Sequence, residues 1–402
     1  AAAALTMMTS GLAGPTEADP YDTAVQAAAS AEADIIAFRH DLHRFPELSG
    51  EEKRTSGKVA AALSELGYDV RTGVGGYGVV ALLEGAGDGP LIAFRADMDA
   101  VAGQAFDPVP YASEIEGVHH ICGHDMHTAI GIGIAEGFAA IRDEMPGSVM
   151  LIFQPAEEAG TGAESMLAEG LFVERRPDAI FALHTAPFDV GQLAVLPDGM
   201  MAGRTLISVS LTGDGNLDAA VSGLRDALEA TGNVSLETML AFRTEPFIFI
   251  NLFPQAPAES GTAKVEGFVM SAGLDDRPRV EKVLREAVVS VDIENVQMSV
   301  TFRQALEGVN NDAALVDRAS AAMNEQAPDI TVFPVPGVIP AFSEDFGSFQ
   351  MTVPGVMYFL GVNNPETGTV GFPHSPDYVA DDGAIMVGTR AMLAAMLEVM
   401  GE

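Results

Sequence analysis

The sequence predicts an α/β protein with two parts. The larger has a mostly parallel sheet flanked by helices, and the smaller is an inserted α+β domain of the ferredoxin-like type. Three observations support this fold class. The 402 residues exceed the usual size of one domain. Buried strands alternate with helices up to about residue 203. From Arg204 the order becomes β-α-β-β-α-β, a ferredoxin-like unit that can fold alone.

The predicted domain boundaries follow from these patterns. Residues 1–31 form a leader, residues 32–203 and 306–402 the larger domain, and residues 204–305 the inserted domain. The leader starts without Met and is mostly apolar up to Ala13, which is typical of the remnant of a secretory signal peptide. A disordered Ala-rich segment is the alternative. The first interpretation predicts a periplasmic or secreted protein, and the second a cytoplasmic one.

Composition limits the classes of partner. The hydrophobic fraction of 48% is enough for full cores, so this is not a disordered chain. The net charge of −36 argues against nucleic acids and anionic membranes as partners, because both require a basic surface. A single cysteine excludes an internal disulfide. We expect no membrane span, because no run after the leader is long, apolar and uninterrupted enough.

The first helical pattern covers Glu32 to Leu42, and Pro46 ends it. Ser49 with Glu52 three residues later matches a capping box and predicts the start of the next helix there.

Metal-binding residue types lie where three predicted buried strands end. The strands cover Leu91 to Asp99, Ser148 to Phe153 and Ala179 to Leu183. The residues at or just beyond their ends are Asp97, Glu157, Glu158 and His184. Ligands of open α/β sheets bind at this edge, and two adjacent carboxylates are costly unless a cation lies between them. A helix cap, a solvated loop and a core histidine remain the respective alternatives.

The stretch from His119 to His127 holds four of the eight histidines and the only cysteine. Thiolate and imidazole groups bind transition metals. Gly123 permits a tight turn, so that Cys122 and His124 can point to one centre. One alternative is a polar turn with a buried thiol. Another is a cysteine hydrolase that uses Cys122 with His124 or His127, which would leave the acidic pair without a role.

After the inserted domain, the sequence returns to alternating helices and strands. A helix is predicted from Asp312 to Glu325 and a closing helix from Asp381 to Met400. Between them, Glu344 lies at an acidic helix start, and His374 follows a Gly- and Pro-rich loop.

Six motifs together resemble the M20 family of metallopeptidases, and in particular its amidohydrolase branch. That branch includes aminoacylases, N-acetyl-diaminopimelate deacetylases and auxin-conjugate hydrolases. The motifs are His40–Ser49, Phe94–Ala100, His120–His127, Phe153–Glu158, Ser343–Phe346 and His374–Ser375. The resemblance covers about residues 32 to 402, and it depends on the combination rather than on any single motif.

The resemblance implies a metal-dependent amidohydrolase of the aminoacylase or carboxypeptidase kind. It would cleave the amide bond of an N-acyl amino acid or a small dipeptide-like substrate. It also implies two divalent metal ions (Zn, Mn, Co or Ni), with Glu157 as the general base toward a metal-activated water and Asp97 orienting a ligand. The implied ligands are Cys122, His124, Glu158, His184 and His374. The inserted domain would act as a lid and join two chains into a homodimer.

One position departs from the family pattern. A histidine that binds substrate usually starts the first helix of the inserted domain, but Leu217 stands there in this chain. Losing one donor to the substrate carbonyl can lower the rate on the order of a hundredfold or more. Asn216, Arg243 and Glu344 are the candidate substrate-binding residues. The alternative function is a weakened or inactive homologue that binds metal and ligand.

Overall fold

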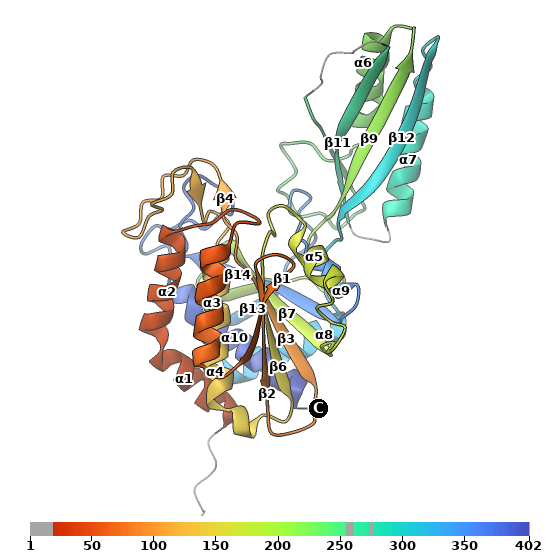
Figure 1. Ribbon diagram of the computed structural model, residues 1–402. Helices are drawn as coiled ribbons and strands as arrows, with labels where there is room; N and C mark the ends of the chain where they lie inside the picture. The colour runs from red at the N-terminus through yellow and green to blue at the C-terminus, as the bar shows by residue number, and fades with distance from the viewer. Residues whose placement is uncertain (1–18, 255–260, 273–275, 402) are drawn as a thin grey trace, which may run out of the picture.

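The computed structural model describes residues 19–254, 261–272 and 276–401. Its large sheet has eight strands in the order β1-β2-β6-β3-β7-β14-β8-β13 (Figure 1). The strands are β1 (Asp69–Val74), β2 (Gly78–Glu84), β3 (Leu91–Asp97), β6 (Ser148–Gln154), β7 (Ala179–Asp189), β8 (Gln192–Val195), β13 (Thr331–Pro334) and β14 (Gly355–Asn363). Strands β6, β3, β7 and β14 are adjacent and parallel, so their carboxyl ends share one edge. The predicted parallel sheet is confirmed.

Two hydrophobic cores cover the faces of this sheet. Strand β3 shows the division, because Ile92, Phe94 and Ala96 lie in one core, whereas Leu91 and Ala93 lie in the other. The first core draws on α1 (Pro20–Ser30), α2 (Glu32–Arg44), α3 (Lys53–Glu65), α4 (His124–Ala140), α8 (Ala313–Gln326) and α10 (Gly383–Met400). The second draws on the short helices α5 (Gly162–Ala168) and α9 (Gly347–Gln350). A strand buried on both faces suits the centre of an α/β sheet.

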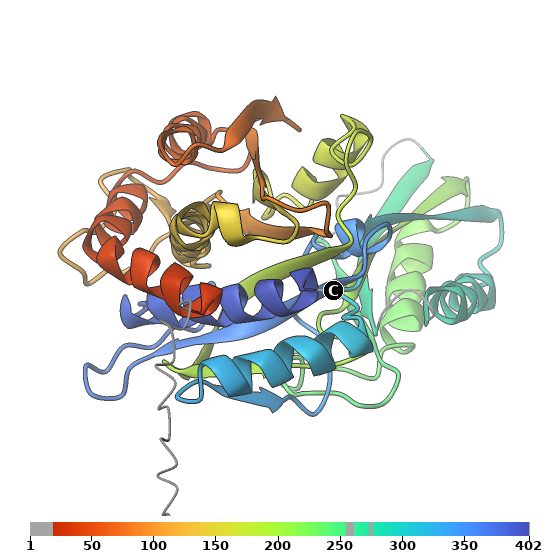
Figure 2. The same cartoon turned by 90° about the horizontal axis from the view of Figure 1, so that it is seen from below.

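Helix α1 corrects the predicted leader. It packs against α4 and α10 and lies beside α10 in Figure 2. Its buried residues Tyr21, Ala24 and Ala28 recur at helical spacing, which explains why this segment belongs to the larger domain. The proposed signal remnant near Ala13 lies outside the described residues and remains a prediction.

Helix α10 also differs from expectation. By length and composition it is apolar enough to cross a membrane, although no such run was expected. However, 67% of this helix is buried within the protein, where it packs against α4 and α8. Burial of this kind is typical of a core helix, since a helix that is hydrophobic on all sides needs partners on all sides.

A second sheet has four antiparallel strands in the order β10-β11-β9-β12. Its elements are β9 (Gly203–Gly213), α6 (Leu217–Glu229), β10 (Ile248–Leu252), β11 (Thr262–Ser271), α7 (Arg277–Ser290) and β12 (Val296–Leu306). The helices α6 and α7 pack together on this sheet (Figure 1). This arrangement is the predicted ferredoxin-like unit. We propose residues 204–305 as its boundaries, since its core lies between Ile207 and Phe302.

Smaller elements complete the large domain. A two-stranded ribbon pairs β4 (Val101–Ala102) with β5 (Val118–His119), and the 3-10 helix η1 covers Arg142–Glu144. The capping box predicted at Ser49 and Glu52 is wrong, because α3 begins at Lys53 with Glu52 itself at the N-cap position and without a side-chain cap bond. The Ser49 hydroxyl donates to Asp99, and the Glu52 carboxylate accepts from the Ala156 amide.

Candidate metal centre

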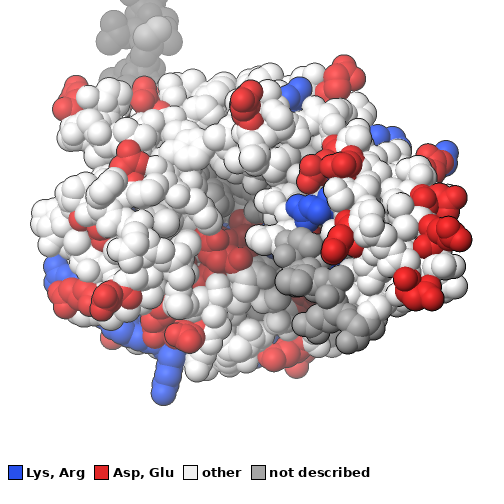
Figure 3. Space-filling view, turned by 90° about the horizontal axis from the view of Figure 1, so that it is seen from above, with Lys and Arg blue, Asp and Glu red and all other residues white. Residues whose placement is uncertain are grey.

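The candidate ligands meet in a cavity of about 500 Å³ that is lined by residues of both domains. Four of the five candidate ligands line the cavity, together with Glu157, whereas His124 is not in its lining. Acidic side chains lie at the bottom of a hollow in the molecular surface (Figure 3). Strand β7 runs to Asp189, five residues beyond His184, because β14 keeps pairing with it as far as Asn363. The prediction that His184 ends its strand is therefore wrong, although its side chain reaches the cavity.

Gly123 shapes the loop that carries Cys122. Its φ is +92°, and a Cβ there would lie 2.2 Å from the Tyr378 hydroxyl and 2.7 Å from Thr185 Oγ1. Thr185 Oγ1 in turn donates a 2.7 Å hydrogen bond to the Cys122 carbonyl. Only glycine fits this position without displacing these groups, so the tight turn inferred from sequence has a steric cause as well as a conformational one.

His124 presents a buried ring nitrogen toward two carboxylates. Nδ1 lies 3.2 Å from Asp99 Oδ1, while Nε2 lies 3.7 Å from Glu157 Oε2 and 3.8 Å from Glu158 Oε1. Among the described residues, Nε2 has no hydrogen-bond partner. Burial opposes protonation, yet Asp97 and Asp99 raise the pKa of His124 to about 10. The site therefore favours a cation at Nε2, and a metal ion satisfies the same nitrogen and both carboxylates.

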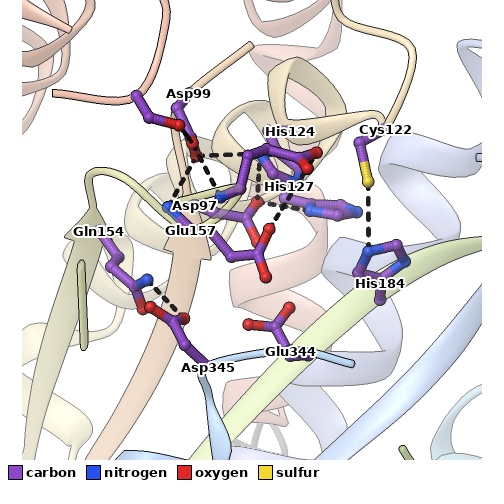
Figure 4. A network of polar contacts seen from close by, with 12 residues as sticks. Asp97, Asp99, Cys122, His124, His127, Gln154, Glu157, His184, Glu344 and Asp345 are labelled. Atoms are coloured by element: carbon purple, nitrogen blue, oxygen red, sulfur yellow. Dashed lines mark hydrogen bonds and ion pairs between the residues drawn. The ribbon is translucent and has the colours of Figure 1, made fainter. Parts of the chain in front are cut away.

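His184 is held in the form that binds metals. Its Nδ1 donates a 2.8 Å hydrogen bond to the Thr185 carbonyl, and its Nε2 lies 3.5 Å from Cys122 Sγ. The two side chains point toward each other (Figure 4). Burial lowers the pKa of His184 to about 4, so the ring is neutral at pH 7. A neutral ring with Nδ1 protonated leaves the Nε2 lone pair free.

Two groups of possible ligands share Cys122. One contains Cys122, His124 and His184, and the other contains Cys122, Glu158 and His374. Within each group the ligand atoms lie within 4.8 Å of one another. Burial and Glu158 raise the pKa of the Cys122 thiol well above its usual range. A cysteine nucleophile needs the opposite shift, whereas a bound cation would stabilise the thiolate.

Two residues at this edge of the sheet adopt positive φ angles, which are unusual for residues other than glycine. Ala156, just before the acidic pair, has a φ of +53°, and His374 has a φ of +62°. The Glu52 carboxylate holds the Ala156 amide at 2.8 Å, and the His374 amide donates to the Ile121 carbonyl at 2.7 Å. Such conformations cost about 1–3 kcal/mol each and concentrate at functional sites.

Asp99 is a site residue that the sequence analysis missed. It accepts hydrogen bonds from His124 Nδ1 and from the backbone amides of Glu157 and Glu158. Asp97, which was expected to orient a ligand, lies 2.6 Å from His127 Nδ1 and 3.8 Å from His124 Nδ1, and it accepts a 2.7 Å bond from Arg95. Asp99 lies two residues beyond Asp97, and this spacing was the available signal for a second carboxylate.

Glu157 has the environment of a proton-transfer group. Its side chain is buried beside the cavity, and Asp99 fixes its backbone. Burial, Glu344 and Glu158 raise its pKa well above the usual range of a glutamate. A carboxyl group with raised proton affinity near a reacting water can accept a proton and return it.

None of the three candidate substrate-binding residues lines this cavity. Glu344 is buried and bound to Arg95 through contacts of 2.8 and 3.2 Å. Asn216 accepts from the Ala219 amide and caps α6, and Arg243 lines a separate cavity of about 790 Å³. Leu217 belongs to the core of the small domain. The structure instead places Arg204, which the sequence analysis did not consider, in the lining of the metal-centre cavity.

Comparison with known proteins identifies the family. The model of peptidase family M20/M25/M40 matches residues 93–398. The chain belongs to this family. It is 30% identical to the N-acetylcysteine deacetylase of Bacillus subtilis over 375 residues, which cover 89% of this chain and 94% of that protein. It is also 30% identical to the N-acetyldiaminopimelate deacetylase of Brevibacillus brevis over 368 residues, covering 88% and 94%.

A solved structure supports the same assignment. The YXEP protein of Bacillus subtilis, a dinuclear metal-binding peptidase of the M20 family, superposes with a TM-score of 0.78 at 27% identity. The match covers 93% of this chain and 99% of that one. The resemblance inferred from the six motifs is confirmed. As a family member, this protein is a metal-dependent hydrolase of the amidohydrolase and peptidase group.

Proposed function

We propose that this protein is a two-metal amidohydrolase that cleaves the amide bond of an N-acyl amino acid or a similar small peptide-like substrate. The observation that carries this proposal is the pair of three-residue ligand groups that share Cys122, with Glu157 beside them. Two relatives named as deacetylases of N-acetyl amino acids support the substrate class. A cavity of about 500 Å³ is in the range that takes small molecules.

The donor set fits the proposed ions. We assign Cys122, His124, Glu158, His184 and His374 as the ligands of two divalent ions. A thiolate, three imidazoles and one carboxylate suit Zn, and Mn, Co and Ni are compatible. Bound there, the ions would polarise the amide carbonyl and lower the pKa of an attacking water.

The protein's own residues supply the remaining steps. Glu157 accepts the proton of the attacking water and later passes it to the leaving amine, as its raised pKa favours. Asp99 keeps His124 in the tautomer with Nδ1 protonated and fixes the backbone that carries the acidic pair. Apolar groups on the cavity wall, including Phe342 and Phe372, limit the access of water around the substrate.

The main alternative is a metal-bound homologue with weakened or no catalysis. It is favoured by Leu217, which offers no polar group at the position where a substrate-binding histidine is expected. Homodimer formation through the small domain is also a proposal. The four-stranded sheet ends in β10 and β12, and an edge strand of this kind offers unpaired backbone groups to a second chain.

The test measures metal content together with hydrolysis of a panel of N-acetyl amino acids, with and without chelator. We expect about two ions per chain and turnover that chelator abolishes. The Glu157→Gln variant should keep its metal but lose about 10²- to 10⁴-fold in kcat, because it lacks the base. Full metal occupancy without turnover of any amide would favour the inactive homologue. Failure to bind metal after reconstitution would contradict the ligand assignment.

A further inference from the structure

Arg204 lies in the wall of the metal-centre cavity. Of the described residues that line the cavity, it alone is a lysine or arginine. It is the second residue of β9, at the point where the chain enters the small domain. The other charged lining residues are the acidic pair, Glu157 and Glu158. A substrate that enters this cavity therefore meets one fixed cation of the protein itself.

The Arg204 guanidinium lies beside the loop of the acidic pair. A Cβ added to Gly160, two residues after Glu158, would lie 2.9 Å from Arg204 Nη2. Gly160 has a φ of +64°, and its amide donates to the Glu157 carbonyl. The turn thus leaves room for the guanidinium next to the cavity. Burial lowers the pKa of Arg204, although Glu157 and the other carboxylates oppose this shift.

Among the described residues, no side-chain hydrogen bond or ion pair engages the Arg204 guanidinium. Its side chain is half-buried, its Nε is buried without a hydrogen-bond partner, and no ion pair joins it to a described carboxylate. Arg95 is a useful contrast, because Asp97, Glu344 and Asp345 all contact its guanidinium. A guanidinium presents planar donors that match a carboxylate in two parallel bonds. Donors left open in a cavity are suited to a ligand that brings the missing acceptor.

Part of the cavity wall is apolar. Met239, Leu240, Phe342 and Phe372 line it. Leu240 is 47% exposed, so an apolar ligand group would cover hydrophobic surface there. The cavity thus combines one cation, one apolar wall and the candidate metal ligands. These three features correspond to three parts of one small molecule: an anion, an apolar group and an amide.

We propose that Arg204 binds the carboxylate of the substrate and selects N-acyl amino acids with a large apolar group over neutral amides. This inference rests on the proposed amidohydrolase function and names its substrate class. Two charge-assisted hydrogen bonds to a carboxylate make a specific contact that a neutral amide cannot replace. Losing the contact should weaken binding of the acid about 10- to 100-fold and leave the neutral amide almost unchanged.

Binding is measured by calorimetry in the metal-loaded Glu157→Gln variant, in which turnover should be about 10²- to 10⁴-fold slower. The probes are N-acetyl-L-phenylalanine and its uncharged carboxamide. We expect the acid to bind at least tenfold more tightly than the carboxamide, and Arg204→Gln to abolish this preference. Arg204→Lys, which keeps the charge but not the paired geometry, should retain part of it. Arg303→Gln is the matched control, because Arg303 is exposed on β12 of the same sheet. Thermal melting checks that each variant is folded.

The outcomes separate this inference from the function on which it rests. An unchanged preference for the acid in the Arg204→Gln variant would overturn the role of Arg204, even if the wild-type protein hydrolyses N-acyl amino acids. An equal loss of binding for both probes would also overturn it, since it would indicate a structural role. If the wild-type protein hydrolyses no amide but the preference depends on Arg204, the proposed hydrolysis fails while the carboxylate site stands.

Discussion

The Asp99→Asn substitution tests how the metal centre is positioned. Asp99 Oδ1 contacts His124 Nδ1 and the Glu157 amide, both at 3.2 Å. Its Oδ2 accepts from Ser49 Oγ at 2.6 Å and from the Glu158 amide at 3.0 Å. Asparagine has one oxygen and one NH₂ group, so one of these two pairs must face a donor. Ser49 can rotate its hydroxyl to accept, so the less costly orientation places NH₂ at the Oδ2 position.

That orientation leaves the Glu158 amide facing the new NH₂ group at about the present 3.0 Å. One unsatisfied donor costs about 1–3 kcal/mol, and loss of such an orienting partner usually lowers metal affinity about 10- to 100-fold. We expect that loss in a competition titration against a chromophoric chelator. Asp41→Asn is the control, since Asp41 pairs with Arg54 and Lys58 on the surface. Unchanged metal affinity in the Asp99→Asn variant would refute the orienting role.

Two further perturbations address the loop and its supporting network. Gly123→Ala should lower the free energy of unfolding by more than about 1–3 kcal/mol and weaken metal binding, because a clash adds to the unfavourable φ. Gly67→Ala, with a φ of +84° but open space around it, isolates the backbone cost in the same denaturation assay, and equal losses would contradict the clash. Burial opposes the protonation of His43, but Asp125 and Asp107 raise its pKa to about 9. Its stabilisation is thus fully present below about pH 6.5 and is lost as the pH rises through 9, on the order of 3 kcal/mol. Urea midpoints measured from pH 6 to pH 10 should decline less in the His43→Gln variant than in the wild type. Parallel pH profiles of the two proteins would contradict the stabilising role of protonated His43.

The sequence predicted those parts of the fold that depend on local pattern. A buried strand was predicted from Leu91 to Asp99, and β3 begins at Leu91 as expected but ends two residues earlier, at Asp97. The two-domain arrangement followed from the change of pattern at Arg204. Helix α1 was missed because small alanines carry its buried face, and the apolar leader before it masked the helical spacing. The strand end at His184 was wrong because pairing with β14, distant in sequence, decides where β7 stops.

The candidate ligands could be named from sequence, but their supporting contacts could not. Glu157 and Glu158 stand out as an adjacent acidic pair, whereas the partner of a carboxylate such as Asp99 depends on how strands and helices pack. Glu344 illustrates this limit, because only the structure shows that Arg95, far away in the chain, occupies its carboxylate. Arg204 is a similar case. Nothing near it in the sequence marks it as functional, and its importance follows from the cavity that it lines.

Metal removal tests whether the centre also stabilises the fold. The cavity edge concentrates negative charge in a protein with a net charge of −36, and burial raises the pKa of both Glu157 and Cys122. Cations bound there would offset this cost, and such binding stabilises only the folded state. At a free metal concentration of 100 times Kd, each ion adds about 2.7 kcal/mol.

The candidate ligands belong to the large domain, whereas the core of the small domain lies between Ile207 and Phe302. Chelator should therefore lower the melting temperature of the large domain by several degrees and leave any separate transition of the small domain in place. Scanning calorimetry of the metal-loaded and chelated protein resolves these cases. If both forms melt at the same temperature, the buried acidic groups are balanced without metal, and the charge argument for the two-ion centre fails. If only the large-domain transition shifts, the cations that would support hydrolysis also stabilise the fold, because they offset the repulsion between its buried carboxylates.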